Sequence, residues 1–343
     1  MKYTTLGNSG TSVSTLALGT MTFGAEADEE ASGDILATYV EGGGNFIDTA
    51  DVYSKGNSEL IIGRWLAGHP TDAAQLVIAT KGRFPMGDGP NDLGLTRRHL
   101  RTALDASLSR LGVEHIDLYQ MHAWDALTPI DETLRFLDDA VSAGKIGYYG
   151  FSNYLGWQLT KAAEVAKSHG WAPPVTLQPQ YSLLVRGIEH EIVPAALDAS
   201  IGLLPWSPLG GGWLSGKYTR DTLPTGATRL GEDPKRGMEA WEARNAEERT
   251  WQIVDAVAAV ASAHSVSSSQ VALAWLLAQP AVTSVILGAR TVAQLTDNLA
   301  SASLTLTAAE LRTLTEVSAP VIDDYPYGVA GTAQRNRKIE GGR

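Results

Sequence analysis

The hydrophobic and polar positions of this chain follow two alternating patterns. Short, nearly continuous apolar runs are typical of strands that are covered on both faces. Between them lie longer segments in which apolar residues recur every three or four positions, as they do along one face of a helix. The apolar runs predict eight strands, at residues 16–20, 45–48, 76–81, 115–122, 146–151, 175–178, 202–206 and 283–287.

The helical patterns fall between and after these strands. They predict helices at residues 28–41, 57–66, 96–111, 130–143, 155–169, 189–199, 245–264, 268–279 and 292–300. A Gly- and charge-rich stretch at 209–245 is predicted to be a long loop. A further helix at 308–317 follows Thr307, with Glu310 three residues on, which is a capping-box pattern.

The order of these elements predicts the fold. Residues 1–15 alternate around Asn8-Ser9-Gly10 and predict a β-hairpin. Alternating strands and helices then imply a parallel sheet, and eight such units imply a closed (β/α)8 TIM barrel of the α/β class. We predict one domain over residues 1–343, with the hairpin at about 1–15, the barrel at about 16–302, and an extra C-terminal helix and tail at about 303–343. The alternative, an open doubly wound sheet, needs a G-x-G-x-x-G turn after the first strand, and residues 18–24 lack that spacing.

The composition excludes several classes of function. The chain has no cysteine, so disulfides, zinc–thiolate sites and cysteine nucleophiles are excluded, and its 7 histidines form no i, i+4 pair that would favour zinc. The net charge of −11 argues against binding to nucleic acid or to anionic lipid. The longest apolar run, at 271–278, is far shorter than the roughly 18 residues of a membrane span. We therefore predict a cytoplasmic protein without a metal and without a nucleic-acid or membrane partner.

Reactive side chains follow three neighbouring predicted strands. Asp48 ends the second strand and Tyr53 follows it, while Lys81 and His122 end the third and fourth. In a barrel of parallel strands these ends share one face, where reactive groups gather. Each residue alone has a structural interpretation, as a cap, an ion-pair partner or a core histidine. Together they predict proton transfer to a carbonyl oxygen.

The residue types suit that chemistry. A phenol has a pKa near ~10 and is a weak acid at neutral pH. A buried Lys81 ammonium beside Tyr53 favours the phenolate and is expected to lower the pKa of the phenol, and Asp48 keeps the lysine charged. His122 can donate a hydrogen bond to the substrate oxygen. General acid catalysis of this kind contributes roughly 10²–10⁴-fold in rate.

These motifs resemble the aldo-keto reductase family, including bacterial members related to ion-channel β subunits. The match keeps the family order over nearly the whole chain. The matching segments are 48–53, 79–81, Gln120-Met121-His122, Gly150-Phe151-Ser152-Asn153, Trp206-Ser207-Pro208-Leu209, Gly216-Lys217-Tyr218, and Gly288-Ala289-Arg290 with Gln294 and Asn298. The resemblance implies a (β/α)8 barrel and NADPH-dependent reduction of aldehydes and ketones. It also implies that Tyr53 is the general acid, Lys81 and Asp48 its tuning pair, and His122 the orienting group.

The resemblance further implies a binding path for NADP(H), with NADH possible. Ser152, Asn153 and Gln178 would bind the nicotinamide carboxamide, and Trp206 would stack on the ring. Arg290 is the cation whose fork can bind the adenosine 2′-phosphate, whereas some relatives carry a second base where Gln294 stands. The remaining cofactor residues, along the pyrophosphate and around both ends, are Gly19, Thr20, Met21, Asp48, Ser207, Pro208, Leu209, Gly211, Lys217, Gly288 and Asn298.

Three aromatic residues follow predicted strands, and two interpretations stay open for them. Phe23, Phe84 and Trp124 either pack the loops or, with Tyr53 and His122, form the wall of an apolar substrate pocket. Residues 211–217 have the G-x-x-x-x-G-K spacing of a P-loop, but Tyr218 stands where Ser or Thr would bind magnesium.

Two other functions are alternatives to the reductase. The first is a nicotinamide-nucleotide-sensing binding subunit, as in the channel β subunits, which generally lack a histidine at the position of His122. The second is a barrel hydrolase that uses Asp48 and Asp51 as paired carboxylates, which leaves Trp206 and Arg290 unexplained. Neither the oligomeric state nor the natural substrate follows from the sequence.

Overall fold

The structure is a computed structural model that describes residues 1–226, 228–235, 237–321 and 325–328. The strands are β1 (Tyr3–Thr5), β2 (Ser12–Ser14), β3 (Leu16–Gly19), β4 (Phe46–Asp48), β5 (Val77–Gly82), β6 (Ile116–Met121), β7 (Ile146–Ser152), β8 (Thr176–Gln178), β9 (Gly202–Leu203) and β10 (Val285–Gly288). The α-helices are α1 (Glu29–Glu41), α2 (Asn57–Gly68), α3 (Pro70–Ala73), α4 (Arg97–Leu111), α5 (Ile130–Ser142), α6 (Gly156–His169), α7 (Ile192–Asp198), α8 (Arg229–Glu232), α9 (Trp241–Ala246), α10 (Glu248–His264), α11 (Ser268–Leu277), α12 (Val292–Leu299) and α13 (Ala308–Val317). The 3-10 helices are η1 (Tyr53–Gly56), η2 (Gly187–Glu189), η3 (Gly210–Ser215), η4 (Gly237–Glu239) and η5 (Ala300–Ser303).

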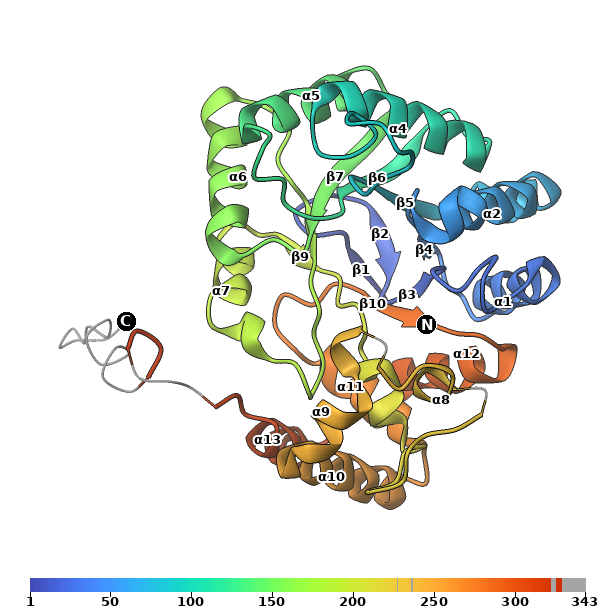
Figure 1. The fold of residues 1–343 in the computed structure, drawn as a ribbon, viewed down its shortest axis with the longest axis vertical. Coiled ribbons are helices and arrows are strands. Elements are labelled where there is room, and N and C mark those ends of the chain that lie inside the picture. The colour runs from blue at the N-terminus through green and yellow to red at the C-terminus, as the bar shows by residue number, and fades with distance from the viewer. Residues whose placement is uncertain (227, 236, 322–324, 329–343) are drawn as a thin grey trace.

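Eight parallel strands form the centre of the molecule, in the order β10-β3-β4-β5-β6-β7-β8-β9. Backbone hydrogen bonds also join the two ends of this sheet. The Leu203 N–H donates to the Ala281 carbonyl at 2.7 Å, and the Ile286 N–H donates to the Pro205 carbonyl at 3.0 Å. Helices such as α1, α2 and α4–α7 surround the strands (Figure 1). The predicted (β/α)8 barrel is therefore confirmed.

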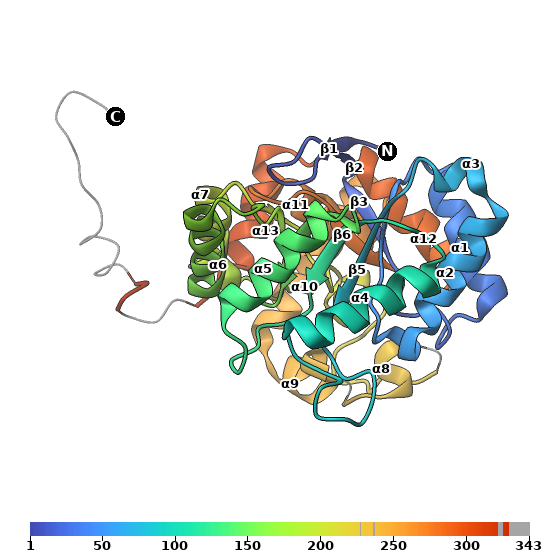
Figure 2. The same cartoon turned by 90° about the horizontal axis from the view of Figure 1, so that it is seen from above.

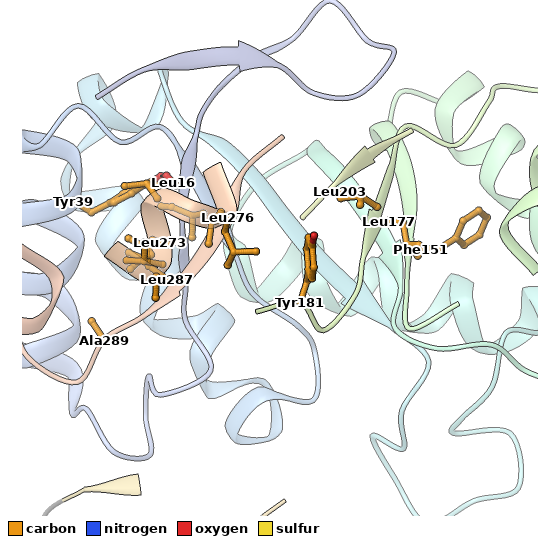
Figure 3. Close-up of a cluster of buried hydrophobic side chains, with 14 of the residues drawn as sticks. Leu16, Tyr39, Phe151, Leu177, Tyr181, Leu203, Leu273, Leu276, Leu287 and Ala289 are labelled. Carbon is orange, nitrogen blue, oxygen red and sulfur yellow. The ribbon is translucent and has the colours of Figure 1, made fainter. Parts of the chain in front are cut away.

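The strand residues alternate between two apolar layers, as the period of two requires. Along β3, Ala17 packs inside the barrel while Leu16 and Leu18 pack outward against the helices. Along β4, Phe46 points inward and Ile47 outward. Figure 3 shows part of the outer layer, with Leu16 beside Tyr39 of α1 on the left and with Leu177 and Leu203, from two other strands, on the right. Polar residues that continue the inward-facing rows therefore reach the interior at the ends of the strands.

The predicted N-terminal hairpin is confirmed, and it covers one end of the barrel. β1 and β2 pair antiparallel, and Leu6 and Val13 are fully buried with the inward-facing residues of the strands. Gly7 has φ +56°, and a Cβ there would lie 1.9 Å from the Val175 carbonyl oxygen, so the turn needs glycine. Figure 2 shows the hairpin at one end of the barrel and α8 and α9 at the other.

Several boundaries differ from the predictions. The strand predicted at 202–206 is only Gly202–Leu203 long, since Pro205 has no N–H to donate. The helix predicted at 189–199 is divided into η2 and α7, and the one predicted at 245–264 begins at Glu248, after the separate helix α9. The short helix α3 was not predicted.

The predicted 209–245 loop contains η3, α8, η4 and most of α9, and it packs through aromatic side chains. The Trp213 and Trp241 rings stack at 4.9 Å, and Trp251 of α10 meets Trp213 edge-on at 5.5 Å. This cluster fixes part of the segment against α10.

The C-terminal helix is confirmed as α13, with the capping box of Thr307 and Glu310 in place. Of the predicted tail, residues 322–324 and 329–343 lie outside the described residues. Within the described ranges, no helix combines the length and apolar character that crossing a membrane requires.

Candidate active site

Lys81 and Asp48 form a buried ion pair inside the barrel mouth. Asp48 is two residues after the inward-facing Phe46, and Lys81 is two residues after Ala79, so strand alternation points both side chains inward. The Lys81 Nζ donates to Asp48 Oδ2 at 2.6 Å and to the Thr49 carbonyl at 2.8 Å. Their side chains are 0% and 2% exposed. Burial lowers the pKa of Lys81, but Asp48 and the nearby phenol outweigh that effect, so the net pKa lies above its usual value and the amine stays charged.

Two amides complete the environment of Asp48. Its Oδ1 accepts a hydrogen bond from Gln120 Nε2 at 3.0 Å and one from Gln178 Nε2 at 2.8 Å. With Lys81 on Oδ2, both carboxylate oxygens are satisfied, which a buried charge requires. The sequence placed Gln120 in a family motif without a role, and the structure shows that it orients Asp48.

Tyr53 lies against the ammonium of Lys81. The Lys81 Nζ is 3.4 Å from the phenol oxygen, and it is 5.0 Å from the centre of the ring. Burial raises the pKa of the Tyr53 phenol by more than Lys81 lowers it, and Asp48 adds to the rise. The prediction of a pKa below the usual value near 10 is therefore wrong, because desolvation outweighs the ammonium. The hydroxyl is protonated at neutral pH and has a cation in place to stabilise the phenolate once the proton leaves.

His122 faces Tyr53 across the pocket. The two ring centres are 5.8 Å apart with the planes at 79°, and Phe84 packs edge-on against the imidazole at 4.6 Å. Burial and the charges of Lys81 and Arg83 bring the pKa of His122 well below its usual value of 6.5. The imidazole is therefore neutral at physiological pH. Among the described residues its Nδ1 has no hydrogen-bond partner.

A pocket of about 530 Å³ opens at these strand ends. Its lining includes Tyr53 and His122, whereas Lys81 lies buried behind Tyr53. Every residue predicted to bind the cofactor lines this pocket, namely Gly19, Thr20, Met21, Asp48, Ser152, Asn153, Gln178, Trp206, Ser207, Pro208, Leu209, Gly211, Lys217, Gly288, Arg290, Gln294 and Asn298.

Polar groups beside Asp48 continue along the pocket. The Asn153 amide donates to Ser152 Oγ and to the His122 carbonyl, both at 3.0 Å, and its oxygen accepts from Trp206 Nε1 at 3.1 Å. Ser152 Oγ in turn donates to the Gln178 carbonyl at 2.9 Å. These bonds fix the amide of Asn153 and the indole of Trp206 relative to His122.

Cations gather where the 209–245 segment meets the barrel. Lys217, Arg229 and Arg290 all line the pocket. Burial lowers the pKa of Lys217, and the charges of Arg290 and Arg229 lower it further. Gly212 has φ +101°, and a Cβ at this position would lie 2.4 Å from Lys217 Cε. Glycine therefore allows both this backbone conformation and the observed path of the Lys217 side chain. Arg229 was not predicted, because it lies in the 209–245 segment, whose sequence shows no helical periodicity although α8 begins there.

Other pocket residues were also missed by the sequence analysis. They are Thr22, Gly212, Ser215, Thr228, Ser269, Ile286, Leu287, Ala289 and Asp297. Some could have been inferred, since Asp297 precedes Asn298 and residues 286–289 flank Gly288. Thr228 and Ser269 carry no such signal. Only the path of the 209–245 segment brings Thr228 to the barrel mouth, and only the packing of α11 brings Ser269 there.

The predicted substrate wall needs one correction. Phe23 is 0% exposed and packs in the outer core, so it cannot line a pocket. Phe84 contacts His122 directly and is half-buried. Trp124 is also half-buried and packs edge-on against Tyr154 at 5.2 Å and Trp157 at 5.5 Å. Phe84 thus lies beside His122, but neither Phe84 nor Trp124 is among the residues that line the 530 Å³ pocket, and their role in a substrate wall stays a prediction.

Asp51 does not form a catalytic pair with Asp48. It is 0% exposed and is absent from the pocket lining, and neither carboxyl oxygen finds a hydrogen-bond partner within the described chain. Burial, reinforced by the Glu59 carboxylate, raises the pKa of Asp51 to about 7, and the nearby Val52 N–H offsets this only in part. The hydrolase hypothesis therefore has no geometric support. Nor does any group of three or more His, Cys, Asp or Glu side chains in the described ranges offer a metal site.

Replacing Asp51 by asparagine is expected to change the pH dependence of stability. A carboxyl whose pKa rises from 3.8 to about 7 on folding destabilises the folded state increasingly as pH rises between those values. The stability of Asp51→Asn relative to the wild type should thus increase by about 2–3 kcal/mol between about pH 5 and pH 8. Urea unfolding of both proteins at each pH measures this difference, and a difference that stays constant with pH would contradict the assignment.

The strand order and the polar pocket define the class as a (β/α)8 barrel with a candidate active site at the carboxyl ends of its strands. The family model described as the aldo/keto reductase family matches residues 15–319, so the chain belongs to the aldo/keto reductase family, as its motifs predicted.

Named relatives of the chain include both enzymes and channel subunits. It is 38% identical to "Uncharacterized oxidoreductase YrpG" of Bacillus subtilis over 92% of this chain and 96% of the relative. It is 33% identical to "Versiconal hemiacetal acetate reductase" of Aspergillus parasiticus over 93% of this chain and 98% of the relative. It is 35% identical to "Probable voltage-gated potassium channel subunit beta" of Oryza sativa over 87% of this chain and 90% of the relative.

Proposed function

We propose that this protein reduces aldehydes and ketones to alcohols, with NADPH as the hydride donor and Tyr53 as the general acid. The observation that carries the proposal is the contact of Tyr53 with a buried, fully satisfied Lys81–Asp48 pair, opposite a neutral His122. A carbonyl oxygen between the phenol and the imidazole would meet a proton donor on one side and a second polar group on the other.

The pocket residues fit a nicotinamide dinucleotide. When bound, this cofactor supplies the hydride. Ser152, Asn153 and Gln178 offer amide and hydroxyl groups for the carboxamide beside Asp48, and Trp206 offers an aromatic face for the ring. Lys217, Arg229 and Arg290 form a cationic group of the kind that phosphates require.

The proton moves from the Tyr53 hydroxyl to the carbonyl oxygen as that oxygen gains negative charge. Lys81 stabilises the phenolate that remains, and Asp48 keeps the ammonium charged and in place. His122 is neutral, so it can donate one hydrogen bond to the oxygen without competing as an acid. Proton donation of this kind contributes about 10²–10⁴-fold in rate.

The reaction should show a distinctive pH profile. Because the pKa of Tyr53 lies above the usual range of a phenol and that of His122 lies well below the usual range of an imidazole, kcat/KM for reduction is expected to be flat through neutral pH. It should fall only as Tyr53 loses its proton in alkaline solution, whereas alcohol oxidation, which needs the phenolate, should increase as pH rises. Initial rates in both directions between about pH 6 and pH 11 measure this. A falling limb for reduction centred near neutral pH would contradict the assigned acid.

Consumption of NADPH with a panel of aldehydes, ketones and sugars, with NADH in parallel, tests the function as a whole. Turnover of at least one carbonyl class, dependent on a reduced dinucleotide, is the expected result. Absence of any consumption, although the dinucleotide binds, would refute the reductase.

The channel-subunit relatives support a second candidate, a nucleotide-sensing binding subunit with little turnover. Two plant relatives are named as probable potassium channel β subunits, and each is 35% identical to this chain. The presence of His122 favours catalysis over this function. A pull-down that yields a stoichiometric membrane partner, together with no carbonyl turnover, would favour the subunit instead.

A further inference from the structure

Arg290, which follows β10, has carboxylate partners from two other segments. Its Nη1 is 2.9 Å from Glu232 Oε1, and its Nη2 is 3.4 Å from Glu26 Oε1. Glu232 ends α8 in the 209–245 segment, and Glu26 lies in the connection between β3 and α1. The guanidinium of Arg290 therefore contacts both the 209–245 segment and the connection between β3 and α1.

The cluster formed by Arg290, Glu232 and Glu26 lies at the edge of the pocket. Arg290 lines the pocket, and its backbone N–H donates to the side-chain oxygen of Gln294 at 2.9 Å. The Arg290 and Glu26 side chains are each 19% exposed, whereas Glu232 is 44% exposed. Glu232 is thus the partner that can leave into solvent most easily.

A guanidinium fork binds a carboxylate and a phosphate through the same N–H groups. An anion that binds Arg290 through these N–H groups therefore competes with the two carboxylates, and it lies close to both of their negative charges. A nucleotide without a 2′-phosphate neither competes for the guanidinium nor brings a negative charge close to the two carboxylates. Both ion pairs of Arg290 can therefore stay intact when it binds.

We propose that Glu232, assisted by Glu26, is a specificity-determining residue that competes with the adenosine 2′-phosphate for Arg290. This inference rests on the proposed nicotinamide-dependent function. It implies that the chain favours NADP(H) over NAD(H) less strongly than Arg290 alone would allow. It also implies that binding of the 2′-phosphate releases α8 from Arg290, while binding of NAD(H) leaves that contact intact.

Equilibrium binding tests the inference without a turnover readout. Dissociation constants for NADP⁺, NAD⁺, 2′,5′-ADP and 5′-ADP would be measured by calorimetry for the wild type and for Glu232→Gln. The variant should bind the two 2′-phosphorylated nucleotides about three- to tenfold more tightly, as expected for removal of one partly exposed competing charge. Its affinity for NAD⁺ and 5′-ADP should change by less than about twofold. Glu26→Gln should act in the same direction with a smaller effect, because its contact is longer.

Two comparisons make the test specific. Glu242→Gln removes the same charge from an exposed position in α9 and should leave the NADP⁺/NAD⁺ affinity ratio unchanged. In an Arg290→Gln background the effect of Glu232→Gln on the ratio should disappear, since the competition needs the guanidinium. A ratio that does not move in Glu232→Gln, or that moves equally in Glu242→Gln, overturns this inference while the reductase function stands. A wild-type chain that binds neither dinucleotide overturns both.

Discussion

Replacing Tyr53 by phenylalanine is expected to lower the rate of carbonyl reduction by about 10²–10⁴-fold, with little change in dinucleotide binding. The substitution removes only the hydroxyl, which lies 3.4 Å from Lys81 Nζ and lines the pocket. The carbonyl oxygen would then have no group of suitable acidity within reach. Single-turnover rates at saturating NADPH separate this loss from any change in binding.

Tyr154→Phe is the matched control for this experiment. Tyr154 is 1% exposed, and its hydroxyl has no hydrogen-bond partner among the described residues. Its removal should leave the rate within about twofold of the wild type, because no contact is lost. If Tyr53→Phe retained the wild-type rate, the proton would come from another group and the assigned acid would be wrong.

Replacing Lys81 by methionine is expected to abolish turnover and also to destabilise the fold. The substitution leaves Asp48 as a buried charge without its counter-ion, which typically costs about 3–5 kcal/mol. Gln120 and Gln178 still donate to Asp48 Oδ1, but Oδ2 loses its partner. Urea unfolding measures the stability, and single-turnover kinetics measure the activity.

Two further variants separate stability from catalysis here. Lys81→Met combined with Asp48→Asn removes the orphaned charge and should regain most of the lost stability without regaining activity. Lys145→Met breaks the exposed ion pair with Asp105 and should cost no more than about 1 kcal/mol. Lys81→Met with full turnover would show that the ammonium has no part in the reaction.

The strand ends illustrate how much of the site the sequence could predict. Strand alternation gives the direction of Asp48 and Lys81 once β4 and β5 are recognised, because each residue is two positions after an inward-facing apolar one. The family order of the motifs then supplied most of the other pocket residues, although it missed several near β10 and α12, such as Ile286 and Asp297. The fold followed from eight repeated units, whose number leaves few alternatives.

The predictions failed where three-dimensional packing decides the outcome. Phe23 has the same sequence context as Phe84, and only the packing of the first connection shows that it is buried. Burial raises the pKa of Tyr53 and the Lys81 ammonium lowers it. The sequence pattern cannot show which of these two effects is larger. Arg229 and Glu232 come from a segment whose sequence has no periodicity, so neither the place of Arg229 in the pocket nor the pairing of Glu232 with Arg290 could be inferred.

The central claim is that hydride passes from a reduced nicotinamide to a carbonyl carbon in the pocket beside Tyr53. The most direct test uses NADPH with both C4 hydrogens replaced by deuterium, an aldehyde that the wild type consumes, and mass spectrometry of the alcohol. The account predicts one deuterium on the carbinol carbon of every alcohol molecule formed, and almost no alcohol from Tyr53→Phe. Alcohol that forms without deuterium at that carbon would contradict it.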